Sequence, residues 1–156
     1  MLVNKRRVAA VIAISVLALI SVLMLGGCKS RTLPGGVKLG DPYDKVMEAA
    51  LKLDPGATEE DNCIICNYVE LYGYDCTLLY YTTESMPLST VSFFTNDEFC
   101  DENDLTKIVS GLTKEYGKPS SSTGNSCLWE FRDLAIMASY DDDISDVTVM
   151  FYKPRA

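Results

Sequence analysis

The chain has 156 residues and a net charge of −8, and 47% of its residues are apolar. This length suits one domain and excludes a large multidomain enzyme, and the apolar fraction excludes a disordered chain. Histidine is absent, which excludes imidazole bases, Ser-His and Cys-His nucleophile pairs and histidine metal ligands.

The first segment has the pattern of an export signal. Lys5, Arg6 and Arg7 precede an uncharged, apolar run from Val8 to Leu25. A basic start followed by an apolar run is typical of a secretory signal, and the basic end stays in the cytoplasm. The run is also long enough to span a bilayer, so an uncleaved signal-anchor helix is the alternative.

The end of this run, Leu25-Gly26-Gly27-Cys28, resembles the lipobox of bacterial lipoproteins. The resemblance implies that residues 1–27 are a cleaved signal peptide and that Cys28 carries lipid. Residues 28–36 would then be the lipidated cysteine and its tether. The implied location is the outer side of the cell membrane, or the outer membrane if the source has two.

Removal of residues 1–27 leaves eleven basic and twenty-two acidic residues, a net charge of −11. Such an acidic domain is repelled by nucleic acid and by anionic lipid surfaces, so we expect neither as a partner. A well-solvated exported domain explains the charge, and attraction to a basic partner or a divalent cation is the alternative.

The sequence pattern of residues 37–156 predicts a single domain that contains two helices. The first follows Asp41 as N-cap and ends at Asp54. The second follows Asp101, which begins a capping box with Asp104, and ends at Gly117. Each helix has one apolar face, formed by Val46, Ala49, Ala50 and Leu53 in the first and by Leu105, Ile108, Val109, Leu112 and Tyr116 in the second.

Between and after these helices, apolar side chains recur at every second residue instead of at helical spacing. This alternation predicts strands. The predicted strands are Asn62–Tyr72, Cys76–Thr83, Leu88–Thr95, Cys127–Arg132, Leu134–Tyr140 and Val147–Lys153. The predicted fold is therefore α+β, with two helices on an antiparallel sheet in the order helix, three strands, helix, three strands.

The two predicted halves, 37–99 and 100–153, suggest a tandem repeat. An offset of about sixty residues places Leu51 on Leu112 and Tyr68 on Trp129. We treat a duplication as a hypothesis that the strand arrangement can test.

The segment from Leu39 to Val46, a capped helix start before a meander, is similar to the repeat unit of β-lactamase-inhibitor-like exported proteins. It is also similar to the small SmpA/OmlA-type lipoproteins of outer-membrane assembly. Tyr116-Gly117-Lys118-Pro119 and the following Trp129 resemble the same unit in the second half. The resemblance implies a fold that presents a sheet face and loops to another protein and performs no chemistry. No individual binding residue carries over from it.

Five cysteines besides Cys28 are candidates for disulfides or free thiols: Cys63, Cys66, Cys76, Cys100 and Cys127. Cys63 and Cys66 have redox or zinc spacing, but a redox CxxC normally opens a helix, and this one lies in a predicted strand. Residues three apart on a strand face opposite sides, so these two thiols should diverge. We expect no metal site and no cofactor.

Two acidic clusters have structural explanations. Asp141-Asp142-Asp143-Ile144-Ser145-Asp146 has oxygen ligands at alternate positions, but it lacks the glycine and the final glutamate of an EF-hand. An acidic hairpin turn is the preferred interpretation, and weak cation binding is the alternative. Helix capping explains the second cluster, formed by Asp97, Glu98, Asp101, Glu102 and Asp104.

Tyrosines are the remaining unusual feature, with nine in the chain. Tyr80 and Tyr81 are neighbours on one strand, so they face opposite sides of the sheet. Exposed aromatics are favoured at protein interfaces, which makes Tyr68, Tyr72, Tyr80 and Tyr81 candidate interface residues. Core packing with hydroxyls that reach water is the alternative.

The function expected from these patterns is a membrane-anchored lipoprotein whose exported domain binds another envelope protein, as a scaffold or an inhibitor, without catalysis. The alternative is a receptor for a small molecule or a peptide, which requires a pocket of a few hundred Å³. The chain shows no phosphate loop and no nucleophile elbow, which disfavours an enzyme.

Overall fold

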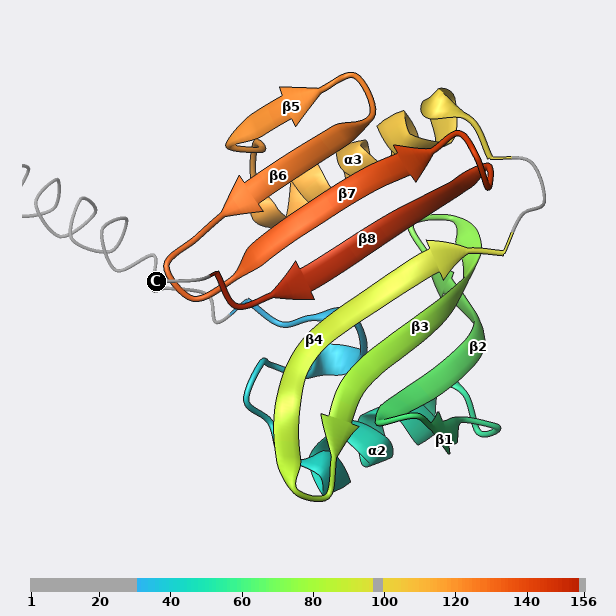
Figure 1. The fold of residues 1–156 in the computed structure, drawn as a ribbon, viewed down its shortest axis with the longest axis vertical. Coiled ribbons are helices and arrows are strands. Elements are labelled where there is room, and N and C mark those ends of the chain that lie inside the picture. Colours follow the sequence, from blue (N-terminus) through green and yellow to red (C-terminus); the bar gives the residue numbers. More distant parts are fainter. Residues whose placement is uncertain (1–30, 97–99, 155–156) are drawn as a thin grey trace, which may run out of the picture. The chain divides into compact units, whose positions relative to one another are not determined.

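A computed structural model of the chain describes residues 31–96 and 100–154 (Figure 1). Contacts divide the chain into two units, Met1–Arg31 and Thr32–Ala156, and the fold below is that of the second unit. The predicted signal peptide and Cys28 lie outside the described residues. Within those residues, no helix is both long and apolar enough to cross a membrane.

The second unit is a mixed α+β domain, as predicted. Two α-helices and a short 3-10 turn accompany one eight-stranded antiparallel sheet. In chain order the elements are η1 (Pro34–Gly36), α2 (Tyr43–Leu53), β1 (Thr58–Glu60), β2 (Cys63–Leu71), β3 (Tyr74–Thr83), β4 (Met86–Thr95), α3 (Glu102–Tyr116), β5 (Ser121–Thr123), β6 (Ser126–Glu130), β7 (Ala135–Asp141) and β8 (Asp146–Tyr152).

The predicted element order is wrong in one respect, because four strands and not three follow each α-helix. All six predicted strands are present, with ends within two residues of the expected positions. The missed strands are β1 and β5, which have three residues each and are fully exposed. Neither alternates apolar and polar residues, so only pairing with β2 and β6 defines them.

The strand order in the sheet is β1-β2-β3-β4-β8-β7-β6-β5. Each group of four strands is a meander, and the groups meet where β4 pairs with β8 (Figure 1). In this pair Val91 lies opposite Phe151 and Phe93 lies opposite Val149. Strands about sixty residues apart in the chain thus lie side by side at the centre of the sheet.

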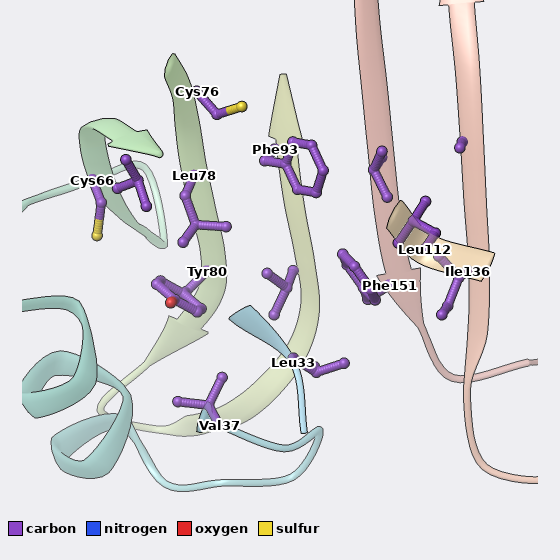
Figure 2. Close-up of a cluster of buried hydrophobic side chains, with 14 of the residues drawn as sticks. Leu33, Val37, Cys66, Cys76, Leu78, Tyr80, Phe93, Leu112, Ile136 and Phe151 are labelled. Carbon is purple, nitrogen blue, oxygen red and sulfur yellow. The ribbon is translucent and has the colours of Figure 1, made fainter. Parts of the chain in front are cut away.

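One face of the sheet, here called the covered face, packs against both helices. Its side chains form a single core with buried residues of α2, such as Val46, and of α3, such as Leu112 (Figure 2). Trp129, Tyr80, Phe93 and the other large side chains of this core are fully buried. Burial of apolar area at ~25 cal/mol per Å² makes this face the main source of stability.

The predicted N-cap is correct for α3 and wrong for α2. Asp101 forms the predicted capping box, since its carboxylate accepts from the amide of Asp104 and the Asp104 carboxylate accepts from the amide of Asp101. Asp41 does not cap α2, which begins after Pro42. Its carboxylate instead accepts from the Lys38 amide and pairs with Lys45, which fixes the turn before the helix.

The segment expected to be a tether, up to residue 36, is partly built into the domain. Leu33 is buried, and its amide donates to the carbonyl of Val37. The Tyr116 hydroxyl donates to the carbonyl of Thr32, and the Tyr80 hydroxyl donates to that of Pro34, each at 2.9 Å. Residues 32–34 therefore contact the folded unit that follows them.

The residue pairs that suggested a duplication lie in different environments. Leu51 is 45% exposed, whereas Leu112 is fully buried. Tyr68 is 79% exposed, whereas Trp129 is fully buried. The sixty-residue alignment therefore does not pair equivalent positions.

Candidate binding face and pocket

The opposite side of the sheet, here called the open face, has no described helix packed against it (Figure 1). Strand register aligns one side chain from each of six neighbouring strands into a line across this face. All are buried or half-buried. This cross-strand row consists of Ile65, Leu79, Ser92, Met150, Met137 and Leu128.

Aromatic side chains border the cross-strand row. Tyr81 and Tyr152 lie on one side of it, and Phe94 lies on the other. Tyr81 is 39% exposed, and the other two are half-buried. Flexible methionines beside aromatic rings adapt to varied partners, and aromatics and methionine are enriched in protein interfaces. The residue types on this face are therefore ones that protein interfaces favour.

The charges of the sheet are all of one sign, because the eight strands contain no lysine or arginine. The described basic residues lie on the helices or in connecting segments. Three of them pair with acids on or beside the helices: Lys45 with Asp41, Lys52 with Glu48 and Lys107 with Asp104. By alternation, the acids on the open face are Glu60, Glu70, Asp75, Glu130, Asp141 and Asp146.

A pocket of about 380 Å³ lies at one end of the sheet, where β3 begins and β4 ends. Its lining includes Thr77 and Phe94 from the open face and Ile144 from the β7–β8 hairpin. Ile144 is 66% exposed. The remaining lining residues are Asn67, Tyr68, Thr95, Asn96, Ser145 and Asp146. The volume is at the low end for ligand sites, which suits a side chain or a small molecule.

A β-bulge places Tyr68 in the pocket wall. Asn67 and Tyr68 lie between the paired residues Cys66 and Val69 and have no partner in β3. Tyr68 has φ +56°, a left-handed conformation that is unusual for a bulky residue and costs about 1–3 kcal/mol. Bulges often redirect a side chain next to a functional site, and this one projects the ring of Tyr68 into solvent.

Polar contacts fix the rest of the pocket wall. The Asp54 carboxylate, at the end of α2, accepts from the amide of Asn67 at 2.8 Å. The Thr95 hydroxyl donates to Asp146 Oδ1 at 2.6 Å and accepts from the amide of Val147. The first contact joins the bulge to the end of α2, and the other two join the end of β4 to the start of β8. The pocket wall is therefore held in place by hydrogen bonds within the domain.

The four tyrosines expected at an interface separate into two groups. Tyr68 and Tyr81 are exposed, on the pocket wall and the open face respectively. Tyr80 is fully buried on the covered face, as expected from its alternation with Tyr81, and so cannot contact a partner. Tyr72 stacks on Phe93, and a Cβ at Gly111 would overlap its ring, so it belongs to the core edge.

The CxxC pair diverges as predicted, with Cys63 on the open side and Cys66 in the core. Burial raises the pKa of each thiol to about 11, so both are protonated at neutral pH and are poor nucleophiles. The thiols of Cys76 and Cys100 are buried and that of Cys127 is half-buried, and all five cysteines are reduced in the structure.

The acidic run 141–146 forms the expected hairpin turn between β7 and β8. The Asp141 carboxylate accepts from the amide of Asp143, which closes the turn. Across the described ranges, no group of three metal-ligating side chains is suitably placed for a metal ion. Asp97 and Glu98, from the second predicted acidic cluster, lie outside the described residues.

The cross-strand row and the pocket were not predicted from the sequence. Both depend on the pairing of β4 with β8, which no local pattern encodes.

Comparisons with known proteins found no matching family model, no matching curated protein and no matching solved structure.

Proposed function

We propose that this protein is a membrane-anchored lipoprotein whose exported domain binds another envelope protein through the open face, as a scaffold or an inhibitor. The observation that carries the proposal is the cross-strand row with its bordering aromatics on a helix-free side of the sheet. Methionine and aromatic side chains are enriched at protein interfaces, and no described helix covers them on this face.

Site-specific photo-crosslinking in intact cells tests this proposal. A photoreactive residue at Leu79 or Met137 samples the open face, and one at Leu51 on α2 is the matched control on the helix layer. We expect one adduct of defined mass from the two open-face positions and none from Leu51. The adduct should disappear when excess unlabelled full-length protein competes.

Two charge variants test whether the cross-strand row supplies the contact with the partner. Met137→Asp and Met150→Asp each place a charge in the row at a cross-strand pair that faces away from the core. We expect each to abolish the adduct while circular dichroism shows a folded domain. Absence of any adduct, or equal adducts from Leu51, would refute partner binding at this face.

The pocket gives specific support to a second candidate function, a receptor for a small molecule or a peptide. Its volume of about 380 Å³ falls within the range of ligand sites, and it combines an apolar ring with amide and carboxylate groups. A bound compound that co-purifies with the protein and is lost in Phe94→Ala would favour this alternative over protein docking.

The membrane anchor of the proposal rests on Leu25-Gly26-Gly27-Cys28, through its resemblance to a lipobox. Two or more acyl chains give stable anchoring, whereas one chain binds marginally. Mass spectrometry of the purified protein should find Cys28 as an acylated N-terminus. Cys28→Ser should release the protein from membranes or leave residues 1–27 attached. An unacylated native protein with residues 1–27 intact would refute the anchor.

We also infer an internal duplication as the origin of the fold. Each half has one α-helix followed by four strands, and the strand order of one half mirrors that of the other about β4 and β8. An offset of 62 residues pairs buried Val46 with buried Ile108, and buried Ala50 with buried Leu112. Homologous sequences should preserve apolar residues at these four positions if the inference is right.

A further inference from the structure

We infer that the partner presents a basic, apolar-flanked segment and that an arginine or lysine of this segment enters the pocket at the end of the sheet. The inference deepens the proposed function, on which its biological meaning rests. It starts from two like-charge pairs that lie directly across neighbouring strands. Glu70 faces Asp75 between β2 and β3, and Asp141 faces Asp146 between β7 and β8.

These pairs flank the pocket on both sides. Asp75 is two residues before Thr77, a lining residue on the same face of β3, which places their side chains one pleat repeat apart. Asp146 is itself a lining residue. Like charges directly opposite each other destabilise a sheet, by an amount of the order of 0.2–1 kcal/mol per pair. A cation between the pairs would offset that cost.

The domain supplies no such cation from its sheet. The strands contain no basic residue, and no described ion pair involves Glu70, Asp75, Asp141 or Asp146. The ion pairs of Lys45, Lys52 and Lys107 lie on or beside the helices. The open face therefore has uncompensated negative charge that a partner can complement.

The pocket walls select a side chain with a long apolar stem and a cationic end. Tyr68 and Phe94 both line the pocket, and guanidinium or ammonium groups bind aromatic rings by cation–π attraction. The exposed Ile144 can contact a methylene stem. The cross-strand row next to the pocket then receives apolar neighbours of the basic residue.

Other occupants fit less well. A metal ion would need a cluster of ligands, and the described residues contain none. An anionic lipid surface or a nucleic acid would be repelled by the acids of the open face. A basic protein segment is the class that satisfies both the charge and the apolar character of this surface.

A peptide titration tests the inference separately from the proposed function. The probe is a fluorescently labelled peptide of alternating leucine and arginine, and its control replaces arginine with neutral, isosteric citrulline. Fluorescence anisotropy measures binding to the full-length protein in nonionic micelles. At 50 mM salt we expect the arginine peptide to bind at least about tenfold more tightly than the citrulline peptide. At 500 mM salt we expect most of this difference in affinity to be lost.

Matched charge variants then locate the interaction. E70Q/D75N removes the carboxylates of one like-charge pair, and D44N/E48Q removes the same charge from α2 on the helix layer. We expect the first to weaken binding of the arginine peptide by about fivefold or more and the second to change it by less than twofold. A photoreactive leucine in the peptide should crosslink to residues 67–68 or 144.

The outcomes separate the two proposals. Equal binding of the arginine and citrulline peptides, or equal effects of the two double variants, overturns the inference of a basic segment. If the cellular adduct from Leu79 persists in that case, partner binding at the open face still stands. If the peptide binds as expected but cells give no adduct, the proposed function fails and the cation-selective site remains.

Discussion

Along each strand of the sheet, side chains alternate between a covered face that is packed by two helices and an open face that is not. The covered face buries Trp129, Tyr80 and Phe93. On the helices packed against it, Lys45, Lys52 and Lys107 pair with acids. The open face carries half-buried apolar side chains and acids without basic neighbours on the strands. The same strands thus pack a core on one side and, on the other, present the surface that we propose binds a partner.

Truncation of a core side chain should give the largest difference between the faces. Trp129→Ala removes a fully buried indole, whose Nε1 donates to the Gly117 carbonyl at 2.7 Å. We expect a loss of about 3–5 kcal/mol in the free energy of unfolding, measured by urea denaturation. Tyr81→Ala on the open face is the matched control, and a loss there below about 1 kcal/mol is expected. Equal losses would contradict the division of roles.

A smaller change removes only a hydroxyl from the covered face. Tyr80→Phe deletes the hydrogen bond to the Pro34 carbonyl and keeps the ring in the core. We expect a loss of about 1 kcal/mol, because the carbonyl loses a partner while packing is retained. Thermal unfolding measures it, with Tyr81→Phe as the control for a hydroxyl on the open face. No loss in Tyr80→Phe would show that the N-terminal segment is not held by this bond.

Acid should weaken the helix layer through Asp104. The Lys107 ammonium, the Asp101 amide and the Tyr74 hydroxyl bond to this carboxylate and lower its pKa to about 2. A lowered folded-state pKa means that this contribution is complete above about pH 5 and is lost as the pH falls toward 2. Urea unfolding between pH 5 and pH 2 should therefore show a shallower acid dependence in Asp104→Asn. An unchanged slope would contradict this assignment.

The smallest expected effect has the opposite sign and lies on the open face. Asp75→Asn removes one member of the like-charge pair with Glu70. We expect a gain of about 0.2–0.5 kcal/mol in the free energy of unfolding at low salt, and a smaller gain at 500 mM salt. Glu48→Gln, which breaks the pair with Lys52 on α2, should not stabilise the protein. A loss of stability in Asp75→Asn would show that the pair is compensated.

Local signals predicted the elements that local chemistry determines. Asp101, Asp104 and Gly117 predicted the two ends of α3 from the sequence, and the structure has the capping box at Asp101 and a positive φ at Gly117. β1 and β5 could not be predicted, because strands of three exposed polar residues form only by pairing with their neighbours. The bulge at Tyr68 was missed because no glycine indicates its left-handed residue.

The site was predictable only in part for the same reason. Alternation separated Tyr80 from Tyr81 correctly, and it separated Cys63 from Cys66. The cross-strand row needs the register between β4 and β8, which joins Ser92 to Met150 across a long stretch of chain. Long-range register depends on how the two halves pack, and that information is not local.

The burial of Leu33 and Val37 has a mechanical consequence for a lipid-linked protein. With lipid on Cys28, only three residues separate the acylated cysteine from the folded unit that starts at Thr32. Four extended peptide steps reach about 14 Å at most, so the domain would be confined next to the bilayer. A pulling force on the lipid would act on the hydrogen bonds that the Tyr80 and Tyr116 hydroxyls donate to Pro34 and Thr32. The domain could bind only targets that lie close to the lipid headgroups.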